Sequence, residues 1–409
     1  MSTITPPKYA KDVLRELETA GYKAFLVGGC VRDMFLERRP QDWDICTNAL
    51  PEEVMSVFPQ SEPTGLRHGT VTVLSRRHRV EVTTFRADGA YKDHRRPETV
   101  QFIADLNGDL ERRDFTMNAI ALPLSGLVID PFDGRLDIRD RQIRCVGEPR
   151  RRFEEDALRM LRALRFSAKL DFEIEAKTAE AIYQCAPLAG ELAPERVRDE
   201  LEKILVSGRP GIVSRVMSFG LLDRYLLRKR AAIDTRRLAT LPRGRQARWA
   251  GLCAALENSR LIHSTALFLR ELRLDGSMIK NCAAGVRIAM HAMPADKVAW
   301  KRLLADQGVD VAACAAAASD MIRPAGATRA LNRVLKSGEC FSMHRLAVTG
   351  DDLLALGMKG VELGSTLREL LSHVIDYPAD NEHDRLLSLA MEISSRNVLQ
   401  CTTIGHCGK

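Results

Sequence analysis

The segment LVGGCVRD (26–33), followed by DWDI (42–45), decides the fold of this 409-residue chain. The apolar run 24–27 ends in a pair of glycines, which predicts a buried strand that turns directly into a helix. Glycines in such a turn let the backbone approach a phosphate, and free N–H groups at the helix N-terminus bind it. We therefore expect Gly29 to contact a phosphate and Arg32 to clamp it. A tight strand-to-helix connection without a ligand is the alternative.

Two carboxylates stand two positions apart in DWDI. On an extended strand Asp42 and Asp44 lie on one face, while Trp43 and Ile45 face the core. Because neighbouring carboxylates repel each other, a cation between them stabilises the arrangement. A divalent metal, Mg²⁺ bridging to a nucleoside triphosphate, fits this need. We therefore predict Asp42 and Asp44 as catalytic metal ligands, and an exposed acidic edge is the alternative.

The rest of the N-terminal part alternates between strand-like and helix-like patterns. The pattern predicts a helix at 52–58 and strands at 71–74, 80–85 and 127–130. Glu81 alternates with valines on the second of these strands. It either lies near the aspartate pair as a third carboxylate or faces solvent.

Strand signals almost vanish after residue 151. Apolar residues at helical spacing predict one helix over 153–168, and helical patterns recur through residue 389. A mixed block followed by helices predicts an α+β fold. We expect three parts: residues 1–150, residues 151–208 and residues 209–409.

The charge is unevenly distributed. The chain has 61 basic and 54 acidic residues, a net charge of +7. Residues 209–273 alone contain fourteen basic residues and four acidic ones. Such a concentration suits a polyanion such as RNA. A solvated basic surface is the alternative.

Composition excludes several classes of protein. Apolar residues are 45% and charged residues 28% of the chain, which is typical of a globular protein. No apolar run approaches the ~18 residues that cross a bilayer, and the first residues lack the apolar core of a secretion signal. The ten cysteines form no CxxC pair. We expect a cytoplasmic protein without a membrane partner.

Five motifs in order resemble one family. It is the nucleotidyltransferase superfamily that includes DNA polymerase β, and within it class II tRNA nucleotidyltransferases (CCA-adding enzymes) and bacterial poly(A) polymerases. LVGGCVRD with DWDI is similar to the family's metal and triphosphate motif. RRDFTMNA (112–119) resembles a ribose-reading motif, and DPFDGRLD (130–137) resembles a head-to-neck turn. EEDALRMLRALRF (154–166) resembles a nucleotide-base template, and ERVRDELEKIL (195–205) resembles the neck helix that supports it.

The resemblance implies a polymerase-β-like nucleotidyltransferase head, then an all-helical neck, body and tail. It implies addition of C, C and A to the 3′ end of tRNA from CTP and ATP, with release of pyrophosphate. It also implies that Arg113 binds near the sugar and phosphates, and that Arg162 and Arg165 contact the nucleotide. The segment 349–376 resembles the tail that holds tRNA.

The template motif has a physical rationale in hydrogen bonding. An aspartate accepts and an arginine donates, so Asp156 and Arg159 together match the edge of cytosine or adenine. Uracil and guanine present the opposite polarity, and each mismatch leaves buried polar groups unpaired at about 1–3 kcal/mol. The alternative is a surface ion pair at i, i+3.

Several products remain open within the family: full CCA, A alone, CC alone or a poly(A) tail. The segment 88–97 resembles the flexible loop that CC-only members lack, which favours retention of A addition. A non-catalytic RNA-binding module is a more remote alternative. The sequence does not fix the oligomeric state.

Overall fold

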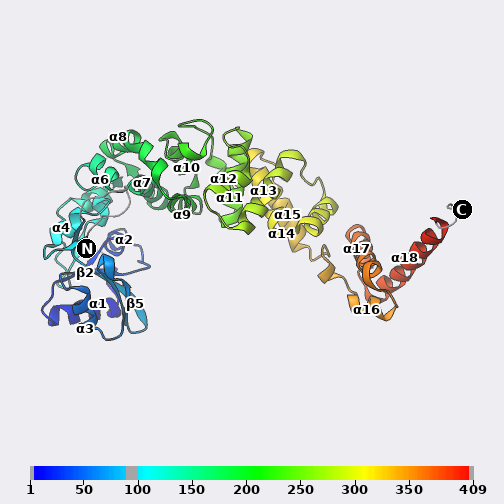
Figure 1. Cartoon of the computed structure of the whole chain (residues 1–409), viewed down its shortest axis with the longest axis horizontal. Coiled ribbons are helices and arrows are strands. Elements are labelled where there is room, and N and C mark those ends of the chain that lie inside the picture. Colours follow the sequence, from blue (N-terminus) through cyan, green and yellow to red (C-terminus); the bar gives the residue numbers. More distant parts are fainter. Residues whose placement is uncertain (1–3, 89–99, 405–409) are drawn as a thin grey trace. The chain divides into compact units, whose positions relative to one another are not determined.

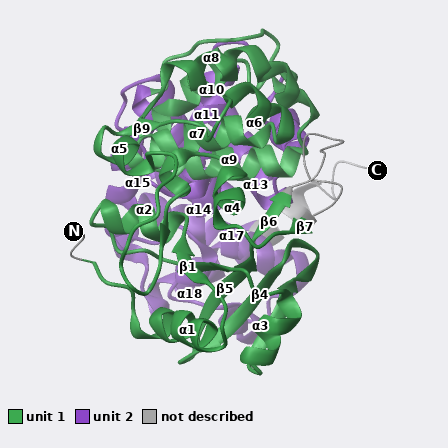
Figure 2. Ribbon diagram, turned by 90° about the vertical axis from the view of Figure 1, so that its left-hand side faces the viewer, with its two compact units in different colours: residues 1–235 green, residues 236–409 purple. Residues whose placement is uncertain are grey.

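The computed structural model describes residues 4–88 and 100–404. The chain divides into two compact units, residues 1–235 and 236–409 (Figure 2). The first unit contains every strand of the described residues, and the second is built of helices and loops (Figure 1).

A six-stranded sheet forms the centre of the N-terminal half of the first unit. In spatial order its strands are β3 (Ser61–Gly65), β4 (Thr70–Ser75), β5 (His78–Thr84), β2 (Asp44–Thr47), β1 (Ala24–Val27) and β8 (Ala121–Leu122). Strand β2 is antiparallel to β1 and parallel to β5. The expected strands at 24–27, 71–74 and 80–85 are therefore confirmed to within a few residues.

The expected strand at 127–130 is wrong. Ile129 makes only an isolated bridge to Ala121, and Leu127 is 76% exposed. The run lies between a glycine turn at Gly126 (φ +83°) and Pro131, so too few residues remain to pair with a neighbouring strand. Two-stranded ladders elsewhere are β6 (Arg86–Asp88) with β7 (Val100–Phe102) and β9 (Gln142–Ile143) with β10 (Glu173–Ile174).

Ten α-helices complete the described part of the first unit. They are α1 (Lys8–Thr19), α2 (Gly29–Phe35), α3 (Pro51–Val57), α4 (Leu106–Glu111), α5 (Gly134–Arg139), α6 (Pro149–Glu155), α7 (Leu158–Leu170), α8 (Ala176–Cys185), α9 (Pro194–Leu205) and α10 (Val213–Ser218). Helix α4 packs on one face of the sheet, where Leu110 meets Val27, Cys46 and Phe85 in a buried cluster. The helix expected at 52–58 is confirmed as α3.

Gly28 makes the turn from β1 into α2 possible. Its φ is +74°, a region that side-chain-bearing residues avoid. A Cβ atom there would lie 3.2 Å from Nη1 of Arg113. The glycine thus permits both the turn and the close approach of a guanidinium group.

The prediction of a single helix over 153–168 is wrong, because the helix is interrupted between α6 and α7. Asp156 has an extended backbone (φ −142°, ψ 102°), and its Oδ1 accepts a hydrogen bond from the N–H of Leu158 at 3.1 Å. This bond to the N–H two residues later is a local turn made by the aspartate side chain, and it satisfies the N–H of Leu158, the first residue of α7. The break also releases Asp156 from the helical spacing that would have fixed its direction relative to Arg159.

Helices account for the second unit in the described range. They are α11 (Arg245–Asn258), α12 (Thr265–Glu271), α13 (Gly276–His291), α14 (Lys297–Ile322), α15 (Ala327–Lys336), α16 (Gly350–Ala355), α17 (Gly360–Asp376) and α18 (His383–Ile404). At Gly285 a Cβ atom would lie 2.5 Å from Cβ of Cys314, so α13 and α14 pack backbone to backbone. Among the described residues, no helix has the length and apolar character to span a membrane.

Candidate active site

A cavity of about 640 Å³ lies within the first unit and gathers most of the predicted site. All seven predicted nucleotide-binding residues line it, and so does one of the two predicted metal ligands: Gly29, Arg32, Arg113, Asp156, Arg159, Arg162, Arg165 and Asp44. Nine arginine or lysine side chains and only three carboxylates contribute to the lining. This excess of positive charge suits a polyanionic ligand such as a triphosphate.

Asp44 stands at the start of β2, with Trp43 and Ile45 buried on either side of it as the alternation predicted. Glu81 lies directly opposite Asp44 in the register of β2 and β5. Burial, then Glu81, and more weakly Asp42, raise the pKa of Asp44 to about 6 against the opposing influence of Arg113. Asp42 precedes the strand, is exposed and is not part of the cavity lining.

This acidic group fits a divalent cation. Burial is the main cause of the raised pKa of Asp44, and the neighbouring carboxylates Glu81 and Asp42 add to it, so a cation bound here would stabilise the ionised form. Within the described ranges, no group of three or more acidic, histidine or cysteine side chains is arranged to hold a metal by itself. Mg²⁺ commonly takes one or two carboxylates and completes its shell with water and substrate phosphates, so two aspartates suffice.

Arg32 is held beside the glycine turn by fixed partners. Its Nη1 donates to Oδ1 of Asn118 at 2.7 Å, and its Nε and Nη2 donate to Asp33 at 2.9 and 2.7 Å. Arg113 approaches from α4, where its Nη2 donates to the buried Asp109 at 3.1 Å. Two guanidinium groups thus converge on the turn at Gly28, which is where a triphosphate needs positive charge.

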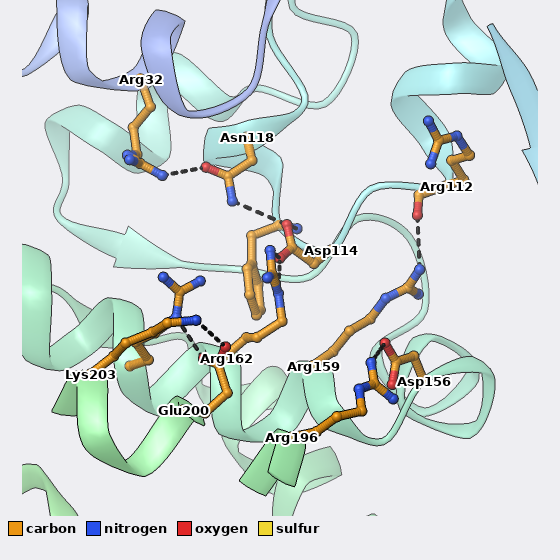
Figure 3. A network of polar contacts seen from close by, with 12 residues as sticks. Arg32, Arg112, Asp114, Asn118, Asp156, Arg159, Arg162, Arg196, Glu200 and Lys203 are labelled. Carbon is orange, nitrogen blue, oxygen red and sulfur yellow. Dashed lines mark hydrogen bonds and ion pairs between the residues drawn. The ribbon is translucent and has the colours of Figure 1, made fainter. Parts of the chain in front are cut away.

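Asp156 and Arg159 line the same cavity but have separate partners (Figure 3). Asp156 accepts from Nη2 of Arg196 on α9 at 3.0 Å. Arg159 donates through Nη1 to Glu155 at 2.8 Å and through Nη2 to the carbonyl oxygen of Arg112 at 2.9 Å. Each side chain is therefore held by partners of its own, and the two do not form the i, i+3 surface ion pair that was the alternative.

Arg162 and Arg165 follow along α7 on the side of the cavity. Arg162 donates to Oδ2 of Asp114 through Nε at 2.8 Å and Nη2 at 2.6 Å. Nε of Arg165 forms an ion pair with Glu200 at 2.6 Å, and its Cζ lies 4.1 Å from the ring centroid of Phe166. Carboxylates and one aromatic ring thus separate charges that would otherwise repel.

Further lining residues were not singled out from the sequence. Asp114 and Asn118 belong to the segment 112–119, and Arg196 belongs to the segment 195–205 expected as a neck helix, which is confirmed as α9. Lys169 lies seven residues after Arg162, so helical spacing could have placed it on the same side of α7. No sequence signal pointed to the others, because their partners are distant in the chain.

Comparisons with known proteins agree with this arrangement. A model of the poly A polymerase head domain matches residues 24–144, and a model of the probable RNA and SrmB-binding site of polymerase A matches residues 171–227. A head of this type, followed by an RNA-binding segment, defines a nucleotidyltransferase. Such enzymes transfer nucleotidyl groups with the help of divalent metal ions.

The relatives match almost the full length of the chain. The CCA-adding enzyme of Geobacillus stearothermophilus is 36% identical over 97% of this chain and 99% of its own. That of Enterococcus faecalis is 36% identical over 95% and 97%. The crystal structure of the Bacillus stearothermophilus CCA-adding enzyme in complex with CTP aligns with a TM-score of 0.76 at 33% identity, covering 97% of this chain and all of the other. The chain belongs to the family of CCA-adding enzymes, the class II tRNA nucleotidyltransferases.

The ion pair of Asp114 with Arg162 predicts a pH-dependent stability. Burial alone would raise the pKa of Asp114, but Arg162 and Asn118 more than offset burial and lower it to about 2. The ionised carboxyl therefore stabilises the fold above pH 4, and this contribution is lost as the pH falls towards 2. We expect Asp114→Asn to lower the free energy of unfolding by about 2 kcal/mol at pH 6.

The measurement is urea unfolding of wild type and Asp114→Asn between pH 2.5 and pH 6. The difference between the two proteins should shrink steadily below pH 4. A difference that stays constant over this range would contradict the assigned pKa.

Proposed function

We propose that this chain adds C, C and A in turn to the 3′ end of tRNA, using CTP and ATP and no nucleic-acid template, and releases pyrophosphate. The observation that carries the proposal is one cavity of the first unit. It combines Asp44, the glycine turn with its arginines, and the Asp156 and Arg159 pair. The full-length relatives that are CCA-adding enzymes give the same reaction independently.

The reaction that we propose is in-line attack of the tRNA 3′-hydroxyl on the α-phosphorus. Asp42 and Asp44 would hold Mg²⁺, which when bound lowers the pKa of the hydroxyl and neutralises charge on the leaving group. Arg32 and Arg113, beside the backbone of Gly29, orient the triphosphate. Arg162 and Arg165 also contact the nucleotide in this proposal.

Base selection rests on the polarity of Asp156 and Arg159. Asp156 accepts from the exocyclic amino group of cytosine or adenine, and Arg159 donates to the adjacent ring nitrogen. Two of the lone pairs of the Asp156 carboxylate are taken by Leu158 and Arg196, and a carboxylate accepts about four hydrogen bonds, so capacity for a base remains. A base with a carbonyl in place of the amino group would face an acceptor with an acceptor.

We also propose the residue ranges 1–150, 151–208 and 209–409 as head, neck, and tRNA-binding body and tail, acting in the cytoplasm. The basic segment 209–273 contributes less free charge than its composition indicated. Arg248 is 1% exposed and donates to the carbonyl oxygen of Pro242, while Arg215 pairs with Glu173 at 3.0 Å. Phosphate contacts therefore fall to the remaining basic side chains of the segment.

An extension assay distinguishes the four products that the sequence leaves possible: full CCA, A alone, CC alone or a poly(A) tail. The segment 88–97, which bears on A addition, falls almost wholly outside the described residues. Transcripts of tRNA that end before CCA, after C and after CC are each offered CTP, ATP, UTP and GTP singly with Mg²⁺. We expect addition of C, C and A respectively, as in the proposed reaction, and no extension with UTP or GTP, because Asp156 and Arg159 admit only cytosine and adenine.

Each other outcome has a definite meaning. Extension of the CC-ended transcript alone indicates an A-adding enzyme, and arrest after CC a CC-adding one. A run of adenosines on any end indicates a poly(A) polymerase. Failure to extend every transcript would contradict nucleotide addition and favour an RNA-binding module.

Removing the cavity's metal-binding carboxylate separates catalysis from binding. We expect Asp44→Ala to lower the rate of incorporation by about 1,000-fold or more, which corresponds to about 4 kcal/mol of lost transition-state stabilisation. The affinity for tRNA should be nearly unchanged. Single-turnover extension gives the first quantity and a filter-binding titration the second. An equal loss of both would rule out the metal role assigned to Asp44.

A further inference from the structure

We propose that Asn118 is a positioning residue that fixes Arg32 for the nucleotide's triphosphate and joins it to the helix that carries the base template. The inference rests on the proposed function, because it assigns a role in nucleotide binding. Asn118 ends a short 3-10 helix, Thr116–Asn118, and lines the cavity. Its side chain is only 7% exposed.

Both ends of the Asn118 amide are used (Figure 3). Its Nδ2 donates to Oδ1 of Asp114 at 3.0 Å, and its Oδ1 accepts from Nη1 of Arg32 at 2.7 Å. Asp114 in turn binds Arg162 through two hydrogen bonds. Four side chains therefore form a continuous hydrogen-bonded chain from α2 to α7.

The residue type follows from the polarity of the two neighbours. Asp114 is ionised and offers only acceptors, whereas the guanidinium of Arg32 offers only donors. A carboxamide carries one donor group and one acceptor on the same rigid plane, so it satisfies both at once. An aspartate would set two carboxylates against each other, and a leucine would leave a buried anion and a buried cation without these bonds.

The effect on Arg32 is to hold its guanidinium in place before a nucleotide binds. Hydrogen bonds to Asn118 and Asp33 use three of its five N–H groups and leave two for a ligand. Nη2 lies 3.6 Å from the position that a Cβ atom of Gly29 would occupy. The remaining donors therefore stand beside the glycine turn, and holding them there removes the entropy cost of ordering Arg32 on binding.

The same link keeps two cations at a fixed spacing. Arg32 and Arg162 both lie over the ring of Phe166, with Cζ atoms 5.2 and 5.6 Å from its centroid. Their repulsion would otherwise move the more weakly held group. The bridge of Asp114 and Asn118 between them opposes this movement, so its loss should be felt as weaker nucleotide binding.

The test is a double-mutant cycle on CTP binding with full-length protein and Mg²⁺. Equilibrium Kd for CTP, and KM for CTP and for tRNA, are measured for wild type, Asn118→Leu, Arg32→Met and the double variant. We expect Asn118→Leu to raise Kd and KM for CTP about tenfold, the loss of one hydrogen bond to a charged group, with the KM for tRNA unchanged. In the Arg32→Met background the same change should have almost no further effect, because Asn118 acts through Arg32.

Thr116→Val is the matched control. Thr116 belongs to the same 3-10 helix, is also buried and donates to Asp137, but it does not line the cavity. The control should lose stability without a change in the Kd for CTP. If Asn118→Leu does not fold, Asn118→Ala removes the same two bonds without added bulk and enters the same cycle.

Additive effects of the Asn118 and Arg32 substitutions, or an equal rise in Kd for Thr116→Val, would overturn the inference. A wild-type protein that binds CTP but extends no transcript would instead count against the proposed function. The two failures are therefore distinguishable.

Discussion

The structure depends on holding like charges together in one cavity. Nine cationic side chains line a space of about 640 Å³, and in the absence of a nucleotide they repel one another. Three of these arginines are each fixed by an ion pair with a carboxylate: Arg162 with Asp114, Arg165 with Glu200 and Arg159 with Glu155. These acidic side chains hold the arginines in position, and the excess positive charge of the lining is available to a ligand.

Carboxylates stand together on the two central strands of the sheet. Asp44 on β2 faces Glu81 on β5, and burial together with this neighbour raises the pKa of Asp44. The cavity combines Asp44 with a mainly basic lining, which suits a metal-bound nucleoside triphosphate. In the proposed function the base of that nucleotide lies at Asp156 and Arg159, which line the same cavity.

Much of this was accessible from the sequence, because the signals were local. The glycine turn and the buried neighbours of Asp44 depend on residues within a few positions of each other, and both were predicted correctly. The break at Asp156 was not, since apolar spacing is the same for one long helix and for two short helices joined by a tight turn. The turn depends on the hydrogen bond of the Asp156 side chain, which apolar spacing does not report.

The rest required tertiary contacts. Asn118 bonds to Arg32 across 86 positions, and Arg162 to Asp114 across 48, so no periodicity could reveal these pairs. The contacts of individual basic residues in the segment 209–273 were not predictable for the same reason. Its composition was visible, but the burial of Arg248 and the pairing of Arg215 with Glu173 depend on parts of the fold that composition does not report.

The central claim is that Asp156 and Arg159 select the base of a nucleotide that is held by the arginines lining the cavity. The most direct measurement is the ratio of kcat/KM for CTP to that for UTP on a tRNA lacking CCA, in wild type, Asp156→Ala and Arg196→Met. The account predicts that Asp156→Ala lowers this ratio by about tenfold or more, since an amino group and a carbonyl then meet no acceptor. Arg196→Met removes the ion pair but keeps the carboxylate, so it should preserve the ratio. A preference for CTP that survives Asp156→Ala unchanged would contradict the account.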